Sequence, residues 1–496
     1  MIKPYIQQLT SASSAIRRYT GSLFGLTSRH QVLIDLDGIE RFLAQHAFSA
    51  HPAQYTIASR VFGGHDSPDF QAKIKSSSKD LLVPVERMFL SETAAAEAID
   101  RAGIPEKVSS LITFSTPSPN NPTPIQPWER SASIHVTTPG TAVEADFHSL
   151  IRDLGACIAI PLLYGHDFLN RYEQLLDDFW TFDNDLFLLC TIGLPTWLPF
   201  KKMRNGVAAR TRLLTQMEAL SRRIDQFQTG APIDFDADIS DISPVAIARA
   251  AVYKSRGWTS EQRAVGELSI LWGQNANTHP ITFWLLLFIY STPGLSKVLR
   301  EELDPYISIA EVTNNDSSPP VTKITAMNHV ALARNCPRFK ACLVETYRMA
   351  NEATAIRHLE KDTTVPDGEH NHHLKAGTFV SVPNSIDQWN PSVYPDPDKF
   401  VPDRFLEVDK ETGRLAARYG KLKPWGLGST MCKGRTFAER EILSVAAAVL
   451  CLWDVNPTTP SWELPAMLPG TGVRRPVRDV RVVITRRRIA SRAERS

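Results

Sequence analysis

The sequence predicts a mainly helical α+β fold, with a large helical body and a small strand-rich part, on three observations. From about residue 144 to 300, apolar positions recur every three or four residues, clearly in 140–163 and 204–228, which is the spacing of amphipathic helices. From 352 to about 424, short strand-like runs alternate with turns rich in Pro, Asp and Gly. A helix over 435–452 and a final strand, "DVRVVIT", then follow.

Composition and charge limit the classes of protein that this chain can belong to. The 496 residues are 43% apolar and 22% charged, which is typical of globular proteins, and a net charge of +2 does not favour nucleic-acid binding. The apolar run "FWLLLFIY" is far shorter than the ~20 residues that span a bilayer. We therefore expect no transmembrane segment and no N-terminal membrane helix in this chain. Six cysteines without a CxxC pair indicate a reducing compartment and separate thiols.

The individual elements follow from local signals along the chain. Residues 28–45 predict a short strand, an Asp-Gly turn and a helix, and the Pro- and Asn-rich residues 116–128 predict a loop. Residues 258–292 predict one long helix, capped by Thr259-Ser260-Glu261. Pro280 lies inside it and should loosen or kink it, because proline lacks the backbone N–H. Residues 338–351 predict a further helix.

A histidine-rich stretch, "EHNHH", contains His370, His372 and His373. Such a cluster suggests metal binding by composition. Its position between Gly368 and "KAGTFV" is typical of a hairpin tip, so we interpret these histidines as a solvated loop.

Cys432 lies between two glycines at the predicted entrance to the helix at 435–452, in the stretch "KPWGLGSTMCKGRTF". Free N–H groups at a helix N-terminus lower the pKa of a thiol, and Gly428 and Gly434 let a flat partner approach the backbone. Zinc is disfavoured, because no other cysteine or histidine lies within eighteen residues. A single thiolate held by N–H donors suits an axial ligand of heme iron. A lone cysteine can also be an inert buried residue, and two further motifs decide between these alternatives.

The first of these motifs is Glu345-Thr346-Tyr347-Arg348, which places an acid and an arginine three residues apart on one helix face. The second is "FVPDRF", whose Arg404 can join a buried Glu–Arg pair and hold the strand-rich part against the helix. Together with the cysteine loop they occur in order within ninety residues.

In these three motifs the chain resembles the cytochrome P450 family. The heme loop of that family corresponds to Trp425, Gly428, Cys432 and Gly434, its Glu-x-x-Arg to Glu345 and Arg348, and its third partner to Arg404. The resemblance implies the cytochrome P450 fold, one catalytic domain over residues 1–496, and heme b with Cys432 as the axial iron ligand. Trp425 and Gly428 would line the heme.

One position of the heme loop departs from the pattern of the family. Thr430 stands where many members have a His or Arg that reaches a heme propionate. Arg357, in "ATAIRHLEKD", matches the strand arginine of the family and is the expected propionate ligand. Trp128 and Arg130 are weaker candidates for a second propionate, and Arg130 suits a surface charge equally well.

In the long helix, the family places an acid before a threonine; here "QNANT" has Asn277 and Thr278. An asparagine cannot ionise, although it can still orient water. This helix and the Thr-x-Cys loop most resemble the branch that holds sterol 7-hydroxylases and prostacyclin synthase. By resemblance Asn277 and Thr278 are the catalytic candidates; Asn277 can instead be a structural residue that bonds across the helix.

The resemblance implies a heme-thiolate monooxygenase that oxidises a hydrophobic small molecule, in specialised (secondary) metabolite biosynthesis, with O2 and electrons from NADPH–cytochrome P450 reductase. Asn277 keeps open an isomerase, dehydratase or ring-rearranging enzyme that needs no reductase, and a heme-binding sensor or carrier is the non-enzymatic alternative. A basic cluster around the loop could contact the reductase: Lys421, Lys423, Lys433, Arg435 and Arg440. The expected location is the cytosolic side of the endoplasmic reticulum membrane, with peripheral contact at most.

Overall fold

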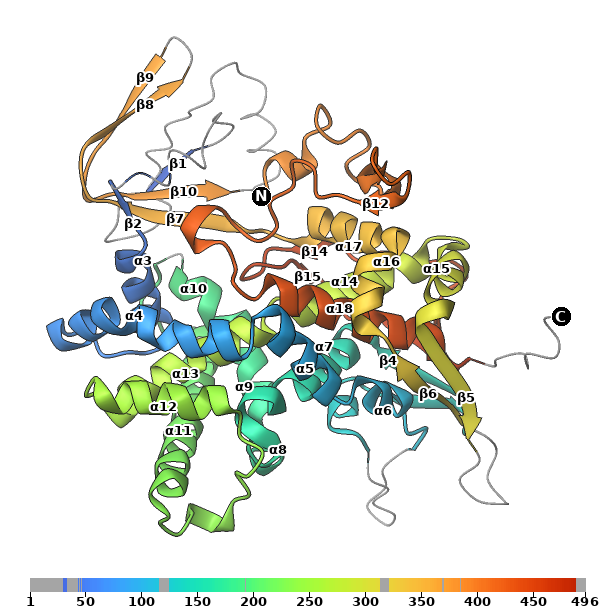
Figure 1. The fold of residues 1–496 in the computed structure, drawn as a ribbon, viewed down its shortest axis with the longest axis horizontal. Helices are drawn as coiled ribbons and strands as arrows, with labels where there is room; N and C mark the ends of the chain where they lie inside the picture. Colours follow the sequence, from blue (N-terminus) through green and yellow to red (C-terminus); the bar gives the residue numbers. More distant parts are fainter. Residues whose placement is uncertain are drawn as a thin grey trace.

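The structure is a computed structural model that describes residues 30–33, 43, 45, 47–115, 125–191, 193–312, 321–367, 370–383 and 385–487. Its helices form a broad body, and strands from both ends of the chain gather at the edges of that body (Figure 1). Most of the predicted helix at 28–45 lies outside the described residues, whereas its strand is present as β1 (His30–Val32). The predicted mainly helical α+β fold is confirmed.

Sixteen α-helices are present among the described residues, and two of them, α17 (Pro337–Ala350) and α18 (Arg435–Leu452), match predicted helices closely. The others are α3 (His51–Thr56), α4 (Pro68–Met88), α5 (Glu92–Arg101), α6 (Ile104–Ser109), α7 (Phe147–Ala159), α8 (Pro161–Arg171), α9 (Leu175–Thr181), α10 (Leu188–Thr191), α11 (Lys201–Thr229), α12 (Pro244–Ser255), α13 (Ser260–Asn275), α14 (Thr278–Ser291), α15 (Leu295–Leu303) and α16 (His329–Asn335). Two π-helical segments also occur, η1 (Ile57–Val61) and η3 (Phe182–Phe187).

Two four-stranded sheets contain strands that are far apart in sequence. One has the order β1-β10-β7-β2, with β2 (Phe48–Ser49), β7 (Thr354–Leu359) and β10 (Phe379–Pro383). The other has the order β13-β16-β4-β3, with β3 (His135–Thr138), β4 (Ala142–Asp146), β13 (Trp453–Pro457) and β16 (Arg481–Arg486). The predicted helical pattern from residue 140 is therefore wrong for 142–146, where the sheet with β16 overrides the apolar spacing.

Four hairpins complete the strand-rich part: β5 (Ile307–Val312) with β6 (Val321–Met327), β8 (Thr363–Asp367) with β9 (His370–Leu374), β11 (Leu406–Val408) with β12 (Leu415–Ala417), and β14 (Met467–Leu468) with β15 (Arg475–Pro476). The β8–β9 hairpin projects from the body, so the predicted hairpin is present (Figure 1). The interpretation of the histidines as a loop is wrong, because they lie in strand β9, paired with β8. No group of three or more metal-ligating side chains occurs among the described residues.

The predicted long helix is interrupted once, between α13 and α14, at Ala276 and Asn277. Pro280 lies one turn beyond Ala276 and has no N–H to donate to the Ala276 carbonyl, so the interruption lies where a proline at 280 weakens the helix. The expected kink is thus present as a break. It places Asn277 at the start of α14 instead of in a continuous helix.

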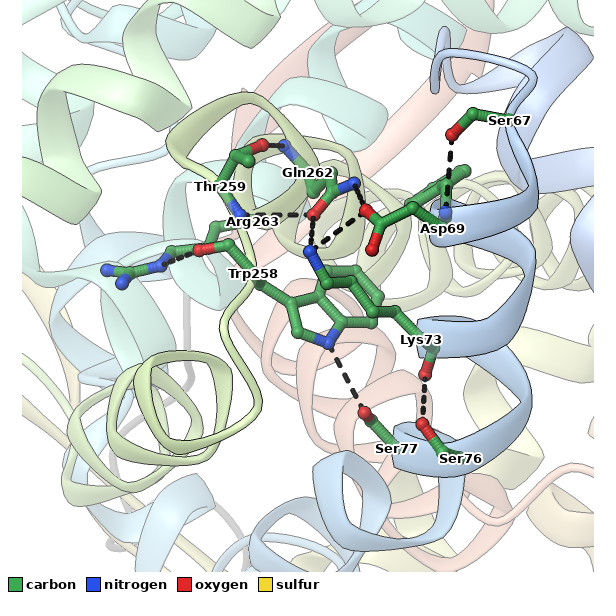
Figure 2. Close-up of polar contacts among 10 residues, drawn as sticks. Ser67, Asp69, Lys73, Ser76, Ser77, Trp258, Thr259, Gln262 and Arg263 are labelled. Carbon is green, nitrogen blue, oxygen red and sulfur yellow. Dashed lines mark hydrogen bonds and ion pairs between the residues drawn. The ribbon is translucent and has the colours of Figure 1, made fainter.

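The start of α13 is fixed by a capping box, in which Thr259 accepts from Gln262 N and the Gln262 side chain accepts from Thr259 N. The Gln262 amide also bonds Asp69 and Lys73 of α4, at 3.0 and 3.1 Å, and Trp258 Nε1 donates to Ser77 Oγ (Figure 2). These contacts hold the N-terminal halves of α4 and α13 together.

A single apolar cluster runs through the helical body and reaches from Val61 to Ile484. Helix α14 is buried on all sides and packs against α7, α17 and α18. Within the described part of the chain, no single helix is long and apolar enough to cross a bilayer. Two bent pairs are long and apolar enough only when taken together: Phe147–Ala159 with Pro161–Arg171, bent by 112°, and Ser260–Ser291 with Leu295–Tyr306, bent by 115°.

Candidate functional site

The cysteine loop joins the strand-rich part to α18. Gly426 and Gly428 have φ values of +81° and +62°, which side chains disfavour, so the two tight turns of the loop depend on glycine. A 3-10 turn, η8 (Gly428–Thr430), follows, and Cys432 N donates to Trp425 O at 2.8 Å. This bond closes the loop and sets Cys432 three residues before the start of α18.

Cys432 is the exposed cysteine of the chain, whereas the other five are buried. Burial raises the pKa of the Cys157, Cys336 and Cys451 thiols to about 12, which leaves them protonated. The Gly434 N–H and the Arg435 charge lower the pKa of Cys432, but desolvation by the surrounding protein outweighs both and its pKa is raised. The expected net lowering of the Cys432 pKa by the helix N-terminus is therefore wrong.

Trp425 anchors the loop on α17. Its ring packs edge-on against the Tyr347 ring, with centroids 5.0 Å apart. Tyr419 stacks on the same Tyr347 ring, with centroids 6.4 Å apart. The Tyr419 hydroxyl donates to Glu439 of α18 at 2.7 Å. The aromatic position of the motif thus holds the loop between α17 and α18.

Arg357 reaches the cysteine loop from β7. It is 2% exposed, and its Nη2 donates to Leu427 O at 3.2 Å, while Nη1 donates to Ile356 O at 2.9 Å. Burial lowers its pKa, and no acid among the described residues counters this effect. A buried guanidinium that bonds only carbonyl oxygens is costly unless an anion joins it.

Glu345, Arg348 and Arg404 come together as predicted. Two bonds of 2.8 Å join the Arg348 guanidinium to both Glu345 oxygens, and both side chains are fully buried. Arg404 Nε lies 3.4 Å from Glu345 Oε1, which also accepts from Val401 N at 3.0 Å. Arg348 further donates to the carbonyls of Gln388 and Lys399, so it holds the segment that leads to the cysteine loop.

Thr430, Trp128 and Arg130 contact other parts of the protein than the Arg357 guanidinium. The Thr430 hydroxyl turns back to Leu427 O at 3.4 Å, within its own loop. Trp128 donates to Leu111 O at 2.9 Å, and Arg130 lines a cavity of about 230 Å³ beside α7, α8 and α9 with Asp153. Trp128 lies on η2 (Pro127–Glu129), which packs on α7, and its assignment together with Arg130 to a second propionate stays a prediction.

Asn277 and Thr278 lie at the α13–α14 break. Thr278 is buried, and its carbonyl accepts from Thr282 Oγ1 at 3.0 Å. Asn277 Oδ1 is buried and has no hydrogen-bond partner among the described residues. It faces Gly472 so closely that a Cβ built there would lie 2.5 Å from it.

The basic cluster is only partly available on the surface. Lys421, Lys423, Lys433 and Arg435 are exposed. Arg440, however, is buried and donates to Glu92 O at 2.7 Å, so its assignment to a docking surface is wrong. Lys433 is 3.4 Å from Glu86. The sequence did not reveal these acids, because they lie more than 340 residues away along the chain.

Asp183 is a buried acid that the sequence analysis missed. Its Oδ1 accepts from Trp272 Nε1 of α13 at 2.8 Å and from Thr471 Oγ1 at 2.7 Å. Thr471 is next to Gly472 and therefore close to Asn277. No local sequence signal could have found this group, since its three members come from segments about 90 to 290 residues apart.

The residues fit the cofactor that the sequence implies. An exposed thiol follows a glycine-dependent loop, and Gly428 lies near the Arg357 guanidinium, which needs an anionic partner. A heme would supply propionates for Arg357 and an iron for the Cys432 sulfur.

Comparisons with known proteins relate the chain to one family by sequence and by fold. Residues 264–476 match the family model "Cytochrome P450". The crystal structure of a cytochrome P450 superposes with a TM-score of 0.62 at 17% identity, over 98% of both chains, which shows that the folds are alike.

Two curated relatives add sequence similarity. Cytochrome P450 monooxygenase poxD of Penicillium oxalicum is 26% identical over 61% of this chain and 57% of its own length. The 25-hydroxycholesterol 7-alpha-hydroxylase of Rattus norvegicus is 24% identical over 60% of this chain and 68% of its own length. The predicted similarity to sterol 7-hydroxylases is confirmed, and the matches span 44% to 57% of the first three relatives.

Proposed function

We propose that the chain is a cytochrome P450 that acts as a heme-thiolate monooxygenase on a hydrophobic small molecule. The match of residues 264–476 to the family model and the similar fold support this proposal. The observation that carries the proposal is the exposed Cys432 thiol on a loop that the buried Arg357 touches. Relatives named as fungal monooxygenases favour specialised metabolism as the setting.

Each residue of the loop has one role in this proposal. Bound heme b would supply the activation of O2 and the oxidation of a C–H bond. Cys432 would bind the iron through sulfur, Arg357 would bind a propionate, and Trp425 and Gly428 would contact the cofactor. The Glu345–Arg348–Arg404 network keeps the loop in position, because Arg348 holds the backbone at Gln388 and Lys399.

Asn277 and Thr278 would orient water for proton delivery. The support is positional: the helix breaks at this point, and Asn277 Oδ1 has no partner among the described residues. An amide can accept and donate hydrogen bonds but cannot itself transfer a proton as an acid. Asn277→Ala should therefore change the fraction of NADPH electrons that end in product, with little effect on heme binding.

Electrons would come from NADPH through cytochrome P450 reductase, docking at the exposed Lys421 and Arg435 near the cysteine loop. We place the protein on the cytosolic side of the endoplasmic reticulum, as a single catalytic domain over 1–496. Peripheral membrane contact is supported by Trp197 and Phe200, which are 77% and 38% exposed and precede two exposed lysines.

The test is turnover of a panel of hydrophobic substrates by purified, heme-loaded protein, with and without reductase and NADPH. The proposal expects oxygenated products only when both are present. Products that form equally without reductase would replace it by the second candidate, a heme-thiolate isomerase or dehydratase, which the non-ionisable Asn277 favours. Correctly loaded protein that converts no member of the panel under either condition would count against both.

A further inference from the structure

Asp183 lies on η3, where a π-helical segment replaces the α-helix between α9 and α10. Such segments are frequent at functional sites. The side chain is 8% exposed. A buried carboxylate is costly unless charges or hydrogen bonds compensate it, so the contacts of Asp183 need an account.

Only one of its two oxygens is compensated. Oδ1 accepts from Trp272 Nε1 at 2.8 Å and from Thr471 Oγ1 at 2.7 Å, whereas Oδ2 has no hydrogen bond among the described residues. Both donors are neutral. A carboxylate that served only as a brace would use both oxygens or pair with a cation, as Glu345 does with Arg348.

The carboxylate is close to the proposed reaction side. Trp272 precedes the break at Asn277 by five residues, or about 7.5 Å along a helix. Thr471 precedes Gly472, which touches Asn277 Oδ1. Gly273, the residue after Trp272 in α13, is exposed, and a Cβ built on it meets nothing within 4 Å.

The charges around Asp183 select the kind of group that would bind there. Arg152 and Arg475 are near enough to lower the pKa of Asp183, although burial is the larger effect and raises it. Neither bonds the carboxylate, because Arg152 pairs with Asp153 at 2.8 Å and Arg475 bonds Asn184 Oδ1 at 2.8 Å. Two cations nearby disfavour an amine ligand and leave a neutral hydrogen-bond donor as the better match.

We propose that Asp183 is a substrate-positioning residue whose free oxygen accepts a hydrogen bond from a hydroxyl group of an otherwise apolar substrate. The inference rests on the proposed function and deepens it: the substrate class becomes hydrophobic alcohols. A site built to bond a hydroxyl rejects the analogue that lacks it, since the polar group of the site then stays unpaired.

The experiment compares matched pairs of ligands, each an alcohol and its deoxy counterpart: cholesterol with cholest-5-ene, and a diterpene and a fatty alcohol with their hydrocarbons. Binding to heme-loaded protein is measured by the ligand-induced shift of the Soret band and by equilibrium dialysis. For pairs that bind, the wild type should favour the alcohol by roughly tenfold or more, the factor expected for a hydrogen bond to a charged group. Equal binding within every pair, or no binding of any alcohol, would overturn the proposal.

Two variants separate positioning from bracing. Asp183→Ala should lose the preference for the alcohol, whereas Thr471→Val removes one bond to Oδ1, leaves Oδ2 in place and should keep the preference. If both variants weaken alcohol and hydrocarbon equally, Asp183 is a brace and the proposal is wrong. Asp183→Asn, which keeps a carbonyl oxygen, should restore part of the preference if Asp183→Ala fails to fold. Wild-type protein without a thiolate-type Soret band would instead contradict the proposed function.

Discussion

Two buried acids lie in different surroundings. Glu345 belongs to the network with Arg348 and Arg404, here called the framework. Asp183 lies beside the α13–α14 break in a group with Trp272, Thr471 and Asn277, here called the wall. Glu345 has a bidentate arginine, a second arginine and a backbone N–H. Asp183 has two neutral donors on one oxygen, and nearby Asn277 Oδ1 has no partner among the described residues. Both oxygens of Glu345 are therefore bonded within the protein and need no ligand. In the wall, Asp183 Oδ2 and Asn277 Oδ1 can still accept hydrogen bonds, as the atoms of a binding surface must.

The largest expected effect comes from breaking the framework. Arg348→Ala leaves Glu345 buried with a poorly placed Arg404, and removing one partner of a buried pair costs about 3–5 kcal/mol. We expect mostly unfolded, heme-free protein, measured by urea unfolding and heme content. Arg418→Ala, which breaks an exposed pair with Asp409, is the control and should cost less than about 1 kcal/mol. Equal stability of the two variants would contradict the role of the framework.

A second prediction concerns Glu441 of α18, which is 1% exposed and has no partner on either oxygen among the described residues. Burial raises its pKa from 4.5 to about 8. Between these values the folded protein holds a proton that the unfolded chain releases. Stability should therefore fall as pH rises through this window, by at most about 1.4 kcal/mol per pH unit.

Glu441→Gln should remove this slope, since an amide keeps the shape and cannot ionise. The measurement is the free energy of unfolding from pH 5 to 8, with the exposed Glu463→Gln as the control that keeps the wild-type slope. An unchanged slope in Glu441→Gln would show that this residue is compensated in the folded protein.

A third prediction tests whether the buried Arg357 guanidinium binds a heme propionate. Arg357→Ala should weaken heme binding by roughly tenfold to a hundredfold, the loss expected for a hydrogen bond between charged groups. Arg357→Lys should recover part of it. Heme affinity is measured by transfer to apomyoglobin, and unfolding of the apoprotein is followed in parallel. Wild-type heme affinity in Arg357→Ala would exclude this residue as a propionate ligand.

Two glycines beside the wall give the smallest and most local test. Gly472→Ala places a methyl group 2.5 Å from Asn277 Oδ1 and should destabilise the protein by about 1–3 kcal/mol. Gly273→Ala, in open space within α13, should stabilise it by about 0.5–1 kcal/mol. Thermal unfolding of both proteins measures the difference. The same sign for both would mean that the space beside Gly273 is filled.

The sequence predicted what local chemistry decides. Helices α11, α17 and α18, the cap at Thr259 and the weakness caused by Pro280 follow from spacing and from the missing N–H of proline. Glu345, Arg348 and Arg404 could be paired because the motif places two of them one helical turn apart. In each case the deciding contact lies nearby in the chain or in a recognised motif.

What the sequence could not predict depends on distant partners. Strand β4 forms because β16 pairs with it across more than 300 residues, and Arg440 is buried by Glu92 from the other end of the chain. Asp183 could not be recognised as a site residue from the sequence, because Trp272 and Thr471, which donate hydrogen bonds to it, are distant along the chain. The pKa of Cys432 also escaped prediction, because desolvation by the fold exceeds the effect of the helix N-terminus.

The most direct test of the central claim is the absorption spectrum of the reduced, carbon-monoxide-treated protein, wild type beside Cys432→Ser. The account predicts a strongly red-shifted Soret band in the wild type and its loss in the variant, which should stay folded because Cys432 is exposed and its loop bond is made by backbone atoms. Folded, heme-loaded wild type without the shifted band, or a variant that retains it, would contradict ligation of the iron by Cys432.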